Sequence, residues 1–114
     1  MNPDNKGLAN VALYLYVARG KKAPKAHPSY ADSATAKISL DNMNCRFEPR
    51  VVALRTTQTL LVGNKDTVGH NTKVDTIKNI PKNPIIPAGG TTEMKFPKEE
   101  RLPTLVSCSI HPWM

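Results

Sequence analysis

The last residues of the chain carry three side chains that can bind a metal. They are Cys108, His111 and Met114, spaced three apart in the run SCSIHPWM. In a strand this interval places neighbouring side chains on opposite faces, and in a helix Pro112 would disturb the hydrogen-bond ladder. A tight loop around one point brings all three together, and metal ligation is the usual reason for such a loop.

The donor types of this loop indicate copper. Thiolate and thioether are soft ligands, and imidazole is intermediate. Two His and one Cys in a plane, with a weak axial Met, form a site for copper that transfers one electron. The loop supplies only one His, so a second has to come from elsewhere. His70, in the turn-rich run NKDTVGHNT, is a better candidate than His27, which we place in a surface loop.

The elements that must position these residues are predicted to be short strands joined by turns. Ten prolines and six glycines punctuate short apolar runs in a chain of 114 residues, which favours strands and turns over helices. Strands are expected within residues 11–17, 35–40, 45–54 (with an edge or bend at Pro49), 59–63, 91–96 and 104–108. Residues 77–90 are expected to be irregular, and residues 96–102 to form one short helical turn. This spacing of strands predicts an all-β antiparallel sandwich.

Two stretches of the chain resemble a known family. SCSIHPWM resembles the copper-binding loop of the cupredoxins, most of all that of the amicyanins, and FEPRVVALRTTQTLLVGNKDTVGHN is similar to the cupredoxin pattern upstream of it. The resemblance covers residues 38–114 and implies a cupredoxin-like Greek-key β-sandwich. We expect one domain, 1–114, that ends after the axial Met and lacks the final strand. The N-terminal run NKGLANVALYLY resembles cupredoxin-like domains of larger exported bacterial proteins, which implies a periplasmic or otherwise extracytoplasmic location, with a signal peptide outside this chain.

The resemblance also implies the residues of the site. The expected ligands of one type 1 copper, which alternates between Cu(I) and Cu(II), are His70, Cys108, His111 and Met114. Asn71 matches the family's Asn that ties the two ligand loops together and helps to hydrogen-bond the thiolate. Pro112 stiffens the loop and removes a possible donor. Trp113 stands where amicyanins commonly have Phe, and it is expected either to cover the copper or simply to pack.

Cys45 is the second thiol of the chain. Strand alternation places it on the same face as Phe47, which in the cupredoxin pattern lies in the core near the copper end, so we expect Cys45 to point inward beside the site. Three roles stay open: a small buried hydrophobe, a disulfide with Cys108, or a zinc site with Cys108, His70 and His111. The zinc site ranks last, because the separation of the two Cys fits no zinc-finger spacing.

The function expected from these features is one-electron transfer between redox partners, and not catalysis, since no carboxylate pair or nucleophile–base spacing stands out. By resemblance, His111 lies nearest the surface and is the electron port. The net charge of +7 favours an acidic partner, and the scattered basic residues argue against nucleic acid. No apolar run is long enough to span a membrane. The alternative is a copper storage or delivery module, or a structural module of a larger surface protein.

Overall fold

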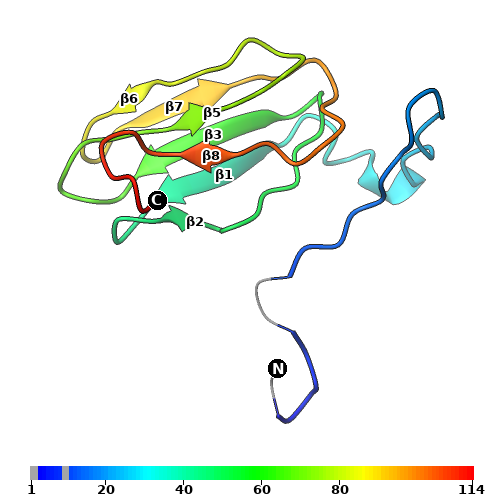
Figure 1. Ribbon diagram of the computed structural model, residues 1–114, viewed down its shortest axis with the longest axis horizontal. Coiled ribbons are helices and arrows are strands. Elements are labelled where there is room, and N and C mark those ends of the chain that lie inside the picture. The colour runs from blue at the N-terminus through cyan, green and yellow to red at the C-terminus, as the bar shows by residue number, and fades with distance from the viewer. Residues whose placement is uncertain (1–2, 9–10) are drawn as a thin grey trace.

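A four-stranded sheet forms the larger layer of the computed structural model, which describes residues 3–8 and 11–114 (Figure 1). The strands of this sheet follow the order β2-β1-β3-β7. Their bounds are Lys37–Asn42 for β1, Phe47–Glu48 for β2, Thr59–Asn64 for β3 and Thr91–Met94 for β7. One turn of 3-10 helix, η1 (Pro28–Tyr30), precedes the sheet and is capped by the exposed side chain of His27.

Strand β3 is the centre of this sheet. It pairs in parallel with β1 and antiparallel with β7, and five of its six residues are buried. A strand that is buried on both faces has a nearly continuous run of apolar residues, and TLLVG is such a run. Gly63 lets Asp41, its neighbour in register on β1, approach closely, because a Cβ there would lie 2.2 Å from Oδ1 of Asp41 and this side chain would have to move.

Two short strand pairs make the second layer. In one, β4 (His70–Asn71) pairs with β6 (Ile85–Ile86), and in the other, β5 (Lys73–Val74) pairs with β8 (Val106–Ser107). Figure 1 shows β5 and β8 drawn over β3 and β1. The apolar core joins the two layers and consists of Leu40, Phe47, Leu60, Val62, Val74, Ile86, Met94, Phe96 and Cys108. The expected all-β sandwich is therefore confirmed.

The strand pairing differs from the expected antiparallel pattern in one place. Among the strands of the described residues, every pair is antiparallel except β1 with β3, which run in parallel from the Lys37↔Thr59 pair to the Asn42↔Asn64 pair. Parallel neighbours cannot be joined by a tight hairpin, and here the chain between them passes through β2 at the sheet edge. Because β1 and β3 run in the same direction, their last residues, Asn42 and Asn64, lie at the same end of the sandwich.

The strand expected at residues 11–17 is absent, so that prediction is wrong. No strand pairs with this segment in the described part of the chain, and Leu13 and Leu15 are 95% and 78% exposed. A side-chain hydrogen bond of 3.1 Å from Arg101 to Tyr16 connects the segment to the rest of the molecule. Alternation of apolar residues is therefore not sufficient for a strand, since a partner edge must also be present.

Three segments between the main strands differ in part from the expected structure. Within residues 45–54, only β2 forms, and Pro49 follows it. Residues 77–90 are mostly irregular but contain β6. The helical turn expected at 96–102 is wrong: the segment contains bends and no helix, and the side chain of Asn79 bonds both the N–H and the C=O of Lys98.

The segment from Cys108 to Met114 follows β8 as bends and turns. It closes on itself through a hydrogen bond of 3.0 Å from the N–H of Met114 to the C=O of His111. In the part of the chain that the structure describes, β8 is the last strand. Among the same residues, no helix has the length and apolar character that crossing a membrane requires.

Candidate metal centre

His70 is placed by the loop that follows β3. The side chain of Asn64, at the end of β3, donates to the C=O groups of Val68 (2.8 Å) and Ile86 (3.0 Å) and accepts the N–H of Asp66 (3.0 Å). A buried amide is costly unless it is hydrogen-bonded, and here it uses both ends to fix the loop. His70 then enters β4 opposite Ile86 and is fully buried.

Cys108 and His111 come from the loop after β8. Cys108 is 2% exposed and belongs to the apolar core, whereas His111 is half-buried. The turn that is closed by the N–H of Met114 directs the His111 ring back over Cys108. One loop thus supplies a buried sulfur and a half-buried imidazole.

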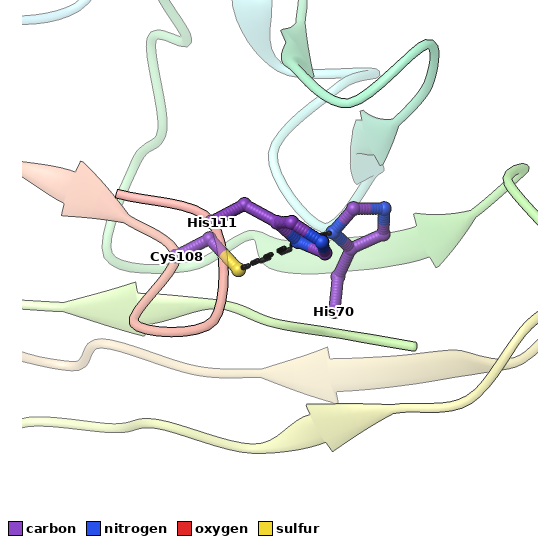
Figure 2. A group of neighbouring side chains, drawn as sticks. All are labelled: His70, Cys108 and His111. Carbon is purple, nitrogen blue, oxygen red and sulfur yellow. Dashed lines mark hydrogen bonds between the residues drawn. The ribbon is translucent and has the colours of Figure 1, made fainter. Parts of the chain in front are cut away.

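Three donor atoms meet where these two loops touch. His70 Nδ1 lies 2.9 Å from His111 Nδ1, and Cys108 Sγ lies 3.9 Å from the first of these nitrogens and 3.8 Å from the second. Figure 2 shows the three side chains pointing toward one another. They form a group with the composition and proximity of a metal site.

The chemistry of this donor set fits a soft cation. Two ring nitrogens 2.9 Å apart must share either a proton or a cation, since their lone pairs otherwise repel. In zinc proteins the metal bonds are about 2.0–2.1 Å to nitrogen and about 2.3 Å to sulfur, so atoms on one ion lie roughly 3–4 Å apart. The two sulfur–nitrogen separations fall in this range, and the nitrogen–nitrogen separation of 2.9 Å lies at its lower limit. Cys with His in one compact set is the donor chemistry of copper and zinc.

Asp66 fixes which nitrogen of His70 faces the donor set. The N–H of Cys45 holds the pKa of Asp66 below its ordinary value, and the His70 side chain and the N–H of Asn44 add to this against the opposing effect of burial. The ionised carboxylate lies 2.8 Å from His70 Nε2. The proton of this hydrogen bond therefore resides on Nε2, which leaves Nδ1 with a free lone pair.

Asn71 joins the two loops through both ends of its side-chain amide. Its Oδ1 lies 2.8 Å from the N–H of Ser109, 3.2 Å from that of Ile110 and 3.3 Å from Cys108 Sγ. Its Nδ2 donates to the side chains of Asn83 and Ser109. Because both ends of the amide are used, the amide has one orientation, and its oxygen faces the sulfur.

The other expected site residues lie around this group. Met114 is half-buried, packs against the core and, with Cys45 and Trp113, lines a hollow of about 430 Å³. Trp113 is 70% exposed, and its ring centre lies 5.1 Å from that of His111. Pro112 is exposed in the turn between them. The Met114 sulfur is not among the three donor atoms described above, so its part in the site stays a prediction.

Cys45 lies close to the site, but for a different reason from the one expected. Its φ is 52°, so it belongs to a left-handed turn before β2, and strand alternation does not orient it. Its sulfur nevertheless lies in a group with Asp66 and His70 whose ligand atoms are all within 4.8 Å of one another. Cys45 and Cys108 are both free thiols in the structure.

Asp66 is the residue of this region that the sequence argument missed. It is the only acidic residue between Glu48 and Asp75, and it stands four positions before His70. A carboxylate that holds the outer nitrogen of a ligand histidine is a recurrent companion of metal sites. A solitary acid in the loop that leads to a candidate ligand was the available signal.

Comparison with known proteins agrees with the architecture. No family model matches the chain, and no curated protein matches it. Among solved structures, a copper-containing nitrite reductase (NirK) from Thermus scotoductus SA-01 matches with a TM-score of 0.57 and 23% identity over 88% of this chain. The chain spans about a quarter, 24%, of that protein's chain. The protein therefore has a cupredoxin-like β-sandwich fold, and its His70, Cys108 and His111 side chains form a compact donor set that could hold a metal ion.

Proposed function

We propose that this chain is a type 1 copper domain that transfers single electrons and is not itself an enzyme. The observation that carries the proposal is the convergence of His70 Nδ1, His111 Nδ1 and Cys108 Sγ, with separations of 2.9, 3.8 and 3.9 Å. A copper ion held there supplies a one-electron couple between Cu(I) and Cu(II). Met114, at the end of the same loop, is the proposed weak axial ligand.

The surrounding hydrogen bonds support a site that changes little between two oxidation states. His70 is buried and held at Nε2 by Asp66, and Cys108 is buried beneath the oxygen of Asn71. Donor groups held in position before the ion binds do not have to rearrange when its charge changes. Fixed geometry of this kind favours electron transfer, because the reorganisation that opposes transfer is small.

His111 is the proposed contact point for a partner. It is the more exposed of the two histidines, and its neighbours Ile110 and Trp113 are 52% and 70% exposed. The adjoining hollow is lined by Arg46 and Arg50. Basic groups beside an apolar contact surface favour an acidic partner, in an encounter of the small and transient kind that redox proteins use.

The proposed setting of this domain follows from the family resemblance. Residues 1–114 are taken as one cupredoxin-like domain. A location outside the bacterial cytoplasm, such as the periplasm, is part of the same proposal. These points rest on the sequence resemblance and on the match of the fold to a domain-sized part of a larger copper protein.

The test of the proposal is the visible spectrum after loading with Cu(II). Thiolate bound to Cu(II) gives an intense band in the visible, so wild-type protein should turn blue or green. Cys108→Ser should abolish the band, and Cys45→Ser, which removes the other thiol, should keep it. A band that survives Cys108→Ser, or that Cys45→Ser abolishes, contradicts the assignment of the ligands.

A second measurement separates electron transfer from copper storage, delivery or a structural role. Electron transfer requires rapid and reversible one-electron reduction at an electrode, with the visible band lost and regained. Copper that is retained in one oxidation state and cannot be cycled would support the storage role. Protein that prefers Zn²⁺ and gives no visible band with Cu(II) would support a zinc site.

A further inference from the structure

One carboxylate contacts both a candidate ligand and a neighbouring turn. Asp66 Oδ1 accepts the N–H of Asn44 at 2.7 Å, and its Oδ2 accepts the N–H of Cys45 at 2.9 Å and Nε2–H of His70 at 2.8 Å. Its side chain is only 13% exposed, so water competes little for these bonds. Three donors from two segments far apart in sequence therefore converge on a single side chain.

The turn that it holds is otherwise unfavourable. Asn44 and Cys45 have φ values of 55° and 52°, a left-handed conformation that Asn tolerates better than most residues but that crowds the Cβ of Cys45. In this conformation two successive N–H groups point the same way, toward the carboxylate, as in the anion-binding nests of other proteins. The charge of Asp66 thus offsets the cost of the turn.

The same turn also touches the second ligand loop. The indole N–H of Trp113 donates to the C=O of Cys45 at 3.2 Å, and the Trp113 ring lies beside that of His111. The Asn44–Cys45 turn is consequently bonded on one side to the segment that carries His70 and on the other to the segment that carries His111.

We propose that Asp66 is a positioning residue of the metal centre, which holds His70 in the tautomer with a free Nδ1 and braces the Asn44–Cys45 turn against both ligand loops. This inference rests on the proposed function for its effect on copper, but its structural part concerns the metal-free protein. An ionised carboxylate on the imidazole N–H makes the ring a stronger donor. Asp66 therefore favours the more highly charged Cu(II) over Cu(I).

A different reading of the same residues is a second metal site formed by Cys45, Asp66 and His70. The hydrogen bonds argue against it, because both oxygens of Asp66 already accept N–H donors and His70 Nε2 is one of the donating groups. These bonds alone explain why the three side chains are close. Binding of two metal ions per chain, with the second lost in Cys45→Ser, would overturn the positioning role.

The first test uses the metal-free protein. In wild type, ¹⁵N spectra should show His70 with its proton on Nε2, and Asp66→Asn should convert it to a mixture of tautomers. Asp32→Asn makes the same change of charge at an exposed residue before β1 and should leave the His70 signals unchanged. Identical tautomer populations in wild type and Asp66→Asn would refute the proposal.

The second test uses the copper-loaded protein. Asp66→Asn should lower the affinity for Cu(II) relative to Cu(I) by at least tenfold, which raises the reduction potential by about 59 mV for one electron. Asp32→Asn should leave it unchanged. An unchanged potential in Asp66→Asn refutes the effect on copper. If wild type binds no copper at all, the proposed function fails, and the tautomer measurement still decides the role of Asp66.

A third measurement needs no variant and covers the case in which Asp66→Asn fails to fold. The amide protons of Asn44 and Cys45 should exchange with solvent at least tenfold more slowly than those of an unstructured peptide of the same sequence, because the carboxylate holds them. Exchange of both at the rate of an unstructured peptide would refute the brace.

Discussion

Removal of the Asn71 side chain should destabilise the metal-free protein by loosening the link between the two ligand loops. Its oxygen accepts the N–H groups of Ser109 and Ile110 at 2.8 and 3.2 Å, and its Nδ2 donates to Asn83 and to the Ser109 hydroxyl. Leucine is close to Asn in size but has neither donor nor acceptor, so Asn71→Leu removes all of these bonds together.

The magnitude follows from how well water can replace each bond. Ser109, Ile110 and Asn83 are exposed, so their freed groups regain water and each bond counts only for its net value of about 0.5–1.5 kcal/mol. The two backbone bonds then amount to about 2 kcal/mol, and the weaker side-chain bonds add little. In a domain of this size, a loss of about 2 kcal/mol lowers the Tm by on the order of 10 °C.

The assay is urea unfolding of metal-free protein, followed by circular dichroism. Asn83→Ala is the matched control, because it removes a single exposed partner of the same amide and should cost less than about 0.5 kcal/mol, as most surface changes do. If Asn71→Leu loses no more stability than Asn83→Ala, the link between the loops is not a significant source of stability and the reasoning fails.

Two further predictions concern the loops away from the site. Burial raises the pKa of Glu100, but hydrogen bonds from the Asn79 side chain and from backbone N–H groups outweigh it and hold the pKa below its ordinary value of 4.5. The Glu100 carboxylate therefore contributes its full stabilisation above that value, and this contribution is lost as the pH falls through the lower pKa of the folded state. When urea midpoints are measured from pH 7 to 3, Glu100→Gln should lose less stability on acidification than wild type. The exposed control Glu99→Gln should behave as wild type. Trypsin should cut first among the basic residues of 19–25, which lie in exposed irregular chain, and mass spectrometry should find a folded product that retains all four proposed ligands; a first cut between residues 37 and 107 would contradict the described fold.

The central part of the site was predictable because its residues are close in sequence. The spacing of Cys108, His111 and Met114 limits them to a tight loop, and the donor types limit the metal. Choosing His70 needed the neighbouring Asn and the family pattern, since sequence spacing says nothing about contacts across 38 residues. The strands at 35–40, 59–63 and 91–96 were predictable for a similar reason, because burial on a sheet leaves a local pattern.

The missed features depend on contacts between distant segments. Asp66 acquires its partners only because Asn44 and Cys45 adopt left-handed φ values, which nothing in their local sequence requires. Residues 11–17 have the alternation of a strand but no neighbouring edge in the described structure. The local sequence pattern shows which residues of a segment can be buried on one face. Whether the segment becomes a strand depends on whether the fold places a neighbouring strand edge beside it.

The division of the donor set between a short loop and a distant strand also bears on folding. Cys108 and His111 stand within four consecutive residues, with the proposed ligand Met114 three residues further on, so this loop can bind a soft cation before any strand has formed. His70 joins them only when β4 pairs with β6 and Asn71 reaches Ser109. A ligand stabilises the native state only by the excess of its affinity there over its affinity for the unfolded chain. The gain in stability on adding a cation therefore measures what His70 and the fold contribute, and not what the loop contributes alone.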